Sequence, residues 1–265
     1  MSGLLALAGR SLVAGALALV FAPGLPAQSA APIADNSFLI EEAYNQEAGV
    51  VQHIGTFARA DGGGSWSSTL TQEWPLGGQR HQVGFTLPVA HADPEGTGLG
   101  DLALNYRYQL AGAGDAPLYV APRLSLLLPT GGEEEGRGRG SLGLQLNLPA
   151  SYVLAPAVAT HWNAGATLGT DETTLDLNLG ASVVWHLRPS FNLLVEAVWL
   201  SEEPAGAARE ESVFLNPGVR WAHDFAGGLQ VVPGVAYTIG LGPSAGDDGL
   251  FLYLSFEHPF AGPTQ

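Results

Sequence analysis

The sequence predicts an all-β fold: a single closed antiparallel transmembrane β-barrel of about twelve strands, with short periplasmic turns and longer acidic extracellular loops. Three observations support this prediction. Apolar and polar side chains alternate with a period of two from about residue 49 to residue 260. The alternating stretches have about ten or more residues, which is enough for a tilted strand to cross a bilayer. The connections between them are short and long in turn, as in outer-membrane barrels.

The first thirty residues indicate export. Residues 1–30 hold one charge, Arg10, which is followed by the apolar run 12–21 and then by small residues at 27–30. This order is typical of a signal peptide, and the apolar run is too short to span about 30 Å of hydrocarbon. We expect residues 1–30 to be removed and the mature chain to lie in the bacterial outer membrane.

Composition excludes several classes of function. The 265 residues carry 25 acidic and 10 basic side chains, and every basic one is arginine. Without a basic patch the chain is a poor partner for nucleic acid. It has no cysteine, so disulfides and thiolate metal sites are excluded. None of the seven histidines has a second His or Asp at ligand spacing on the same strand face, so we expect no metal site and no cofactor.

Residues 31–48 form an N-terminal segment between the signal peptide and the first strand. Ser37 is predicted to cap a short helix that ends at Gly49, with Glu41 and Glu42 in the early turns where the helix dipole favours acidic side chains. The sequence leaves three placements open: a plug in the lumen, a periplasmic segment, or an extension of the first strand. Our hypothesis is that residues 35–48 restrict the pore.

The barrel itself is predicted to occupy residues 49–260, followed by a tail at 261–265. Its first strand is the least regular, because Val50, Val51 and Ile54 do not settle on one face. The last strand ends in Phe256, His258 and Phe260 on one face, which resembles the aromatic-ended strand that outer-membrane assembly machinery recognises. The predicted strands are 49–59, 65–76, 81–91, 99–110, 118–129, 141–154, 158–169, 174–187, 191–200, 212–225, 229–241 and 249–260.

The apolar face is predicted to contact lipid. From the second strand onward it carries no Asp, Glu or Arg, as expected when each such charge costs a few kcal/mol in the bilayer. Its aromatic side chains, such as Trp74, Tyr152, Trp185 and Trp221, gather near strand ends, where membrane interfaces favour them. Membrane lipid and lipopolysaccharide are therefore the expected surroundings. The acidic loops either share divalent cations with lipopolysaccharide phosphates or are merely solvated. A soluble sandwich or lipocalin-like barrel is the alternative fold.

The polar face is predicted to surround the lumen. Glu196 and Arg220 fall on neighbouring strands, so we expect an ion pair between them. The lumenal polar residues either brace the interior or line a solute path. The candidates for that path are Glu73, Asp101, Asn105, Arg107, Arg123, His161, Asp176, Asn178, His186, Glu196, Asn216 and Arg220.

The expected function is the passive passage of small solutes through a narrow polar lumen, since twelve strands leave little room. A structural or adhesive barrel without transport is the alternative. We expect no enzyme, although some twelve-stranded barrels are phospholipases, because their His-x-Ser-Asn-Gly pattern is missing. Residues 242–246 do read Gly-x-Ser-x-Gly, but a strand follows them where a nucleophile elbow needs a helix, so we predict a loop.

The segment 38–47, Phe-Leu-Ile-Glu-Glu-Ala-Tyr-Asn-Gln-Glu, followed by Gly-Val-Val-Gln-His-Ile at 49–54, resembles a group of outer-membrane proteins. They are often labelled transporters and are similar to the family called MetA-pathway of phenol degradation. The resemblance implies a barrel that takes up small compounds, many of them hydrophobic or aromatic. It implies no particular substrate-binding residue.

Overall fold

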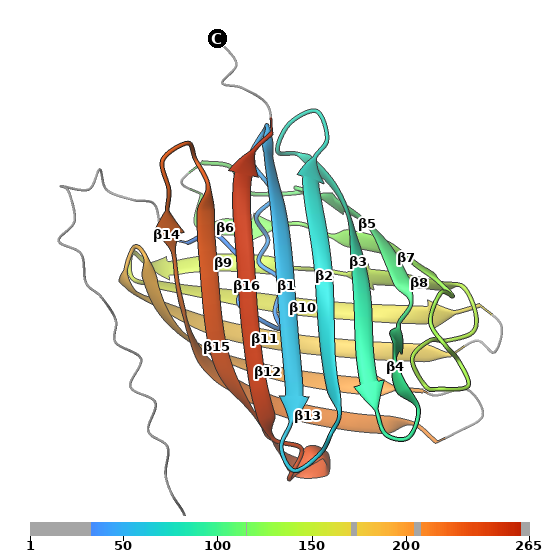
Figure 1. Ribbon diagram of the computed structural model, residues 1–265. Helices are drawn as coiled ribbons and strands as arrows, with labels where there is room; N and C mark the ends of the chain where they lie inside the picture. The colour runs from blue at the N-terminus through green and yellow to red at the C-terminus, as the bar shows by residue number, and fades with distance from the viewer. Residues whose placement is uncertain (1–32, 115, 171–173, 204–207, 261–265) are drawn as a thin grey trace, which may run out of the picture. The chain divides into compact units, whose positions relative to one another are not determined.

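The structure, a computed structural model, describes residues 33–114, 116–170, 174–203 and 208–260. The predicted signal peptide and C-terminal tail lie outside these residues. The described chain forms one antiparallel sheet that closes on itself. Figure 1 shows the last strand, β16, beside the first strand, β1. The final pairing joins β10 to β11. Within the described residues, no helix is long and apolar enough to cross a membrane.

Each predicted strand is present. Eight of the twelve are continuous, and four are made of two collinear pieces: β4 with β5, β6 with β7, β8 with β9, and β13 with β14. The bounds are β1 Val50–Ala60, β2 Trp66–Pro75, β3 His81–Ala92, β4 Gly96–Leu99, β5 Leu102–Tyr108, β6 Leu118–Val120, β7 Arg123–Leu128, β8 Gly143–Asn147, β9 Ala150–Ala155, β10 Val158–Gly169, β11 Leu175–Arg188, β12 Phe191–Glu202, β13 Glu210–Trp221, β14 His223–Asp224, β15 Gln230–Gly240 and β16 Gly249–Pro259.

Two of the interruptions have proline as their cause. Pro122 separates β6 from β7 and Pro149 separates β8 from β9, and proline offers no N–H to the ladder. The sheet remains hydrogen-bonded there because the carbonyl group of each proline still accepts a hydrogen bond from the neighbouring strand. The N–H of Tyr108 donates to the Pro122 carbonyl at 3.1 Å, and that of Ala121 donates to the Pro149 carbonyl at 3.1 Å. The barrel wall is therefore continuous across both breaks.

The two faces of the wall are sorted as predicted. Leu144, Leu146, Leu179 and Leu252 are each more than 40% exposed, which fits a face that contacts acyl chains. The inward face is polar and buried; its members include Gln52, Glu73, Gln82, Asn147, Ser151, Asn163, Ser182 and Asn216. A closed barrel with this arrangement is a transmembrane one.

Connections differ in length between the two ends of the barrel. At one end the turns 156–157 and 189–190 have two residues each, and at the other the loop 129–142 has fourteen. The Gly-x-Ser-x-Gly stretch lies in a loop, as predicted, where Gly242–Ser244 form a short 3-10 turn (η1) before β16. The Ser244 hydroxyl accepts from the N–H of Val213 at 3.1 Å.

The helix predicted at 37–49 is wrong. Residues 33–49 form an irregular segment with bends at 35, 38–40 and 43 and no helix, and its side chains and backbone contact the inward face of the barrel. Ser37 caps nothing; its hydroxyl shares a 2.8 Å hydrogen bond with the hydroxyl of Ser182 on β11. The reason is that side chains of the wall bind the backbone N–H groups that a helix would use for itself.

Candidate functional site: the lumen and its N-terminal segment

Polar side chains from ten of the twelve strands hold the segment 33–49 inside the barrel. Backbone N–H groups of the segment donate to oxygen acceptors of the wall at nearly every residue from 38 to 46. The donor and acceptor pairs are Phe38, Leu39 and Ile40 to Glu196, Glu41 to Asn163, Ala43 to Ser151, Asn45 to Gln109 and Gln46 to Gln82. The wall thus supplies the acceptors that buried backbone requires.

Glu196 on β12 accepts three consecutive backbone N–H groups. Its carboxylate lies 2.9 Å from the nitrogen of Phe38, 3.0 Å from that of Leu39 and 3.1 Å from that of Ile40. The Asn216 amide donates to its second oxygen at 2.7 Å. A fully buried carboxylate is tolerated here because four donors surround it.

The predicted ion pair between Glu196 and Arg220 is wrong. Glu196 pairs across the ladder with Asn216, while Arg220 lies opposite Asn192, four residues before Glu196 on β12. The prediction that both side chains point into the lumen is correct, and both are fully buried in the interior. The partner of each charge is the N-terminal segment, which the pairing argument did not include.

Arg220 on β13 binds the other side of the segment. Its guanidinium donates to the backbone carbonyls of Asp35 and Asn36 at 2.6 Å each and forms an ion pair with Glu42 at 3.0 Å. Glu42 is also 3.4 Å from the His161 ring nitrogen Nε2. Glu196 therefore binds backbone N–H groups of this short stretch, and Arg220 binds its backbone carbonyls and the Glu42 carboxylate.

His161 belongs to a second contact of the segment. Its Nδ1 shares a 2.7 Å hydrogen bond with the Ser151 hydroxyl, which accepts from the N–H of Ala43 at 2.8 Å. Ser151, His161 and Glu42 thus lie in a row. All three are buried, and all three take part in the contact between the wall and the segment. His161 points inward, as predicted.

Two further arginines complete the attachment. Arg123 on β7 forms a bidentate pair with Glu41, with Nε 3.0 Å and Nη2 2.6 Å from its carboxylate. Burial raises the pKa of Glu41, but the attraction and hydrogen bonds of Arg123 outweigh burial and hold that pKa below its usual value. Arg107 on β5 donates to the Asn45 side chain at 2.8 Å and lies 3.9 Å from Glu73.

The remaining predicted lumenal residues lie on the wall and bind other residues of the wall or its loops. Asn105 accepts from Arg123 at 3.1 Å, and Asn178 donates to Asn147 at 3.4 Å. His186 shares a 2.9 Å hydrogen bond with Asn192. Asp101 and Asp176 lie at the long-loop end. The structure therefore brings eight of the twelve into contact with the segment, directly or through another of the twelve. Arg107, Arg123, His161, Glu196 and Arg220 bind it directly, and Glu73, Asn105 and Asn216 bind Arg107, Arg123 and Glu196 in turn.

Sequence reasoning missed most of the residues on the segment side. Asp35, Asn36, Glu41 and Glu42 were not candidates, because nothing local shows that a segment outside the strands lies in the lumen. On the wall, inward parity would have added more residues had it been applied to every uncharged polar side chain and not only to Asn105, Asn178 and Asn216: Gln52, Gln82, Ser125, Ser151, Asn163 and Ser182.

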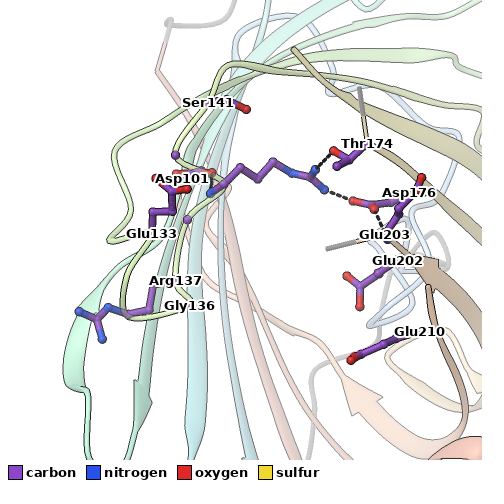
Figure 2. Close-up of a pocket in the computed structure, with 13 residues that line it drawn as sticks. Asp101, Glu133, Gly136, Arg137, Ser141, Thr174, Asp176, Glu202, Glu203 and Glu210 are labelled. Carbon is purple, nitrogen blue, oxygen red and sulfur yellow. Dashed lines mark hydrogen bonds and ion pairs between the residues drawn. The ribbon is translucent and has the colours of Figure 1, made fainter. Parts of the chain in front are cut away.

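A cavity of about 820 Å³ lies at the long-loop end. Figure 2 shows Asp176, Glu202 and Glu210 on one side of this cavity and Asp101 and Glu133 on the other. Six acidic side chains and two arginines line it in all. Both arginines are paired with carboxylates, Arg137 with Glu135 and Arg139 with Asp176, so the mouth of the barrel is acidic.

Replacing Arg139 by serine is expected to loosen the loop 129–142. Arg139 reaches from this loop to Asp176 and Thr174 at the opposite side of the mouth. Because the pair is partly exposed, its loss corresponds to about 0.5–1 kcal/mol, or roughly a two- to fivefold larger open population. Cleavage after Glu133–Glu135 by a glutamyl endoprotease should accelerate by that factor. Arg188→Ser at the opposite end of β11 is the control, and equal acceleration in both variants would contradict the expectation.

These features define the class of the protein: a transmembrane β-barrel of the outer-membrane type, whose lumen holds its own N-terminal segment. The chain belongs to the family described as "Putative MetA-pathway of phenol degradation", whose model matches residues 32–240. This confirms the family resemblance. No curated protein sequence matches the chain.

The chain is also similar to solved structures, of which the first supports the fold. The COG4313 outer membrane channel from Pseudomonas putida F1 is similar with a TM-score of 0.60 and 16% identity, over 82% of this chain and 98% of that one. The KdgM porin matches with a TM-score of 0.49 and 8% identity over 79% and 99% of the two chains. The CymD monoaromatic hydrocarbon channel matches with a TM-score of 0.46 and 10% identity over 83% and 90%.

Proposed function

We propose that the chain is a channel of the bacterial outer membrane for the passive passage of small solutes, and that residues 35–48 restrict its pore. The observation that carries the proposal is the position of the segment between two cavities. Residues 39–41 line a cavity of about 240 Å³ on one side, together with Arg123 and Asn178. Residues 42 and 44–47 line one of about 610 Å³ on the other side, near the short turns.

The twelve predicted lumenal residues fit this proposal as parts of the path and of its closure. Asp101 and Asp176 line the outer mouth, Arg123 and Asn178 the middle cavity, and His161 and His186 the cavity near the short turns. Polar linings of this kind set selectivity in pores. Hydrophobic or aromatic solutes are the proposed cargo, which the family description supports by its reference to phenol degradation.

The remaining parts of the proposal concern export and surroundings. Residues 1–30 would direct secretion, and the aromatic end of β16 would be recognised by the outer-membrane assembly machinery. The acidic long-loop end would face lipopolysaccharide outside the cell.

Planar-bilayer conductance tests the proposal. A variant that lacks residues 35–48 is expected to carry a clearly larger current than the full chain, because the two cavities would then join. Equal currents would reject the role of the segment. Proteoliposomes that contain the deletion variant should leak sugars, carboxylates or aromatic compounds, and leakage of none of them would favour a structural or adhesive barrel instead.

A further inference from the structure

We propose that the lumenal pocket of Phe38 is a binding site for the aromatic ring of a permeating solute, which Phe38 itself occupies while the segment is in place. The ligand class is a small aromatic compound with an N–H or O–H donor two carbons from its ring. This inference rests on the proposed channel function and names its solute.

The Phe38 ring lies in an apolar chamber within a polar lumen. Its side chain is almost fully buried, and its centroid is 5.7 Å from that of Phe251 and 5.4 Å from that of Tyr253, with the rings tilted by 45° and 51°. Tilted pairs at these distances are favourable for aromatic rings. The remaining apolar neighbours are Ile54, Val184, Leu194 and Ala236, from four different strands.

Two glycines of the wall make room for the ring. A Cβ atom on Gly218 would lie 2.6 Å from Cε2 of Phe38, and one on Gly234 would lie 2.4 Å from Cε1. Neither glycine has a positive φ, so the backbone conformation itself would accept other residues. What these positions require is space. At Gly234 the atoms in the way belong mainly to the Phe38 ring, whereas at Gly218 a Cβ would also lie 2.7 Å from the carbonyl oxygen of Val235 and 2.7 Å from Cβ of Ala236.

The border of the chamber offers polar groups that match a donor. Glu196 accepts the N–H of Phe38, whose nitrogen is separated from the ring by two carbon atoms. A phenylethylamine places its ammonium group at the same separation from its ring, and it would meet a buried carboxylate. Two residues that adjoin the chamber have buried polar atoms with no hydrogen-bond partner among the described residues: Asp35, whose other oxygen binds the Tyr253 hydroxyl, has a free Oδ2, and Arg220, whose Cβ lies beside Gly234, has a free Nε.

Phe38→Ala in the full chain tests the ring site directly. The variant, folded in detergent, is expected to bind toluene saturably, because removal of the ring leaves an apolar cavity of matching shape. The doubly substituted Phe38→Ala, Gly234→Val fills that cavity and should bind toluene about tenfold more weakly or worse, a difference of about 1.4 kcal/mol. Leu39→Ala is the matched control, because Leu39 belongs to the same segment but lines the middle cavity. Titration calorimetry measures all three.

The second arm uses the unaltered protein in a planar bilayer. Phenylethylamine is expected to raise the conductance by competing with Phe38 for its site, and 2-cyclohexylethylamine, which has the same donor but a thicker ring, should raise it less. Toluene binding that Gly234→Val leaves unchanged would overturn the inference, and so would an equal response to the two amines. If the deletion variant conducts while these results fail, the channel function stands and only the ring site is rejected.

Discussion

Replacing Arg220 by methionine is expected to release the N-terminal segment and raise the conductance of the barrel. Arg220 is fully buried, and its guanidinium is the cation that faces Glu42 and the carbonyls of Asp35 and Asn36. Removing one partner of a buried ion pair costs about 3–5 kcal/mol, because the other charge remains without compensation. The ratio of released to seated segment should then rise by roughly a hundredfold or more. Single-channel recording measures it as the open fraction.

Two controls separate this effect from a general loss of charge. The double variant Arg220→Met, Glu42→Gln removes the uncompensated carboxylate and should recover a large part of the closed state. Arg209→Met removes a pair with Glu203 that is 35% and 42% exposed, so its expected effect is within about 1 kcal/mol. If Arg220→Met conducted no more than the full chain, Arg220 would not hold the segment. If Arg209→Met opened the pore as well, the cause would be overall charge.

The period of two was enough to predict the wall of this barrel. A strand turns alternate side chains to opposite faces, so Leu252 and Leu254 had to share a face that Glu196, Asn216 and Arg220 do not occupy. The signal is strong because both faces are chemically constrained: lipid excludes charges from one, and the lumen requires polar groups on the other. Strand count and parity therefore follow from local sequence alone.

The contents of the lumen did not follow in the same way. The pairing of Glu196 with Arg220 failed because parity fixes the face and leaves the register open, and the two residues lie four positions apart on the ladder. The helix expected at 37–49 failed because acceptors such as Glu196, Asn163 and Ser151 come from strands more than a hundred residues away. Helix propensity is a weak prior beside such tertiary hydrogen bonds.

The glycines on inward faces are visible in the sequence, but the sequence does not show what packs against them. Gly180, Gly218 and Gly234 lie on inward faces, the first two between polar side chains and Gly234 between Val232 and Ala236. In the structure all three accommodate the segment, since a Cβ on Gly180 would lie 2.2 Å from Cδ1 of Ile40. Sequence alone shows that a wall position is small and cannot show which distant residue fills the space.

Arginine at position 254 is expected to destabilise the folded barrel by about 2–4 kcal/mol, the cost of a lipid-facing cation near the bilayer midplane. Leu254 lies in the middle of β16, on the outward face, and is 44% exposed. Leu254→Arg would place a guanidinium among acyl chains, where water is scarce, beside Gly55 of β1 and Pro233 of β15. Denaturant titration of the protein folded into lipid vesicles measures the loss as a shift of the unfolding midpoint.

Leu250→Arg is the matched control, because it makes the same change on the same face of the same strand but at its loop end. Leu250 is the second residue of β16 and is 40% exposed, and it lies opposite Arg59 of β1 and Tyr237 of β15, where the wall already carries a cation on this face. Near an interface a long cationic side chain reaches the headgroups, and the expected cost falls to about 0–1 kcal/mol. Equal losses at both positions would mean that the leucines do not face lipid, since an apolar core would penalise both charges alike. A large loss at 254 with a small one at 250 requires a gradient of polarity along the strand, which a bilayer supplies.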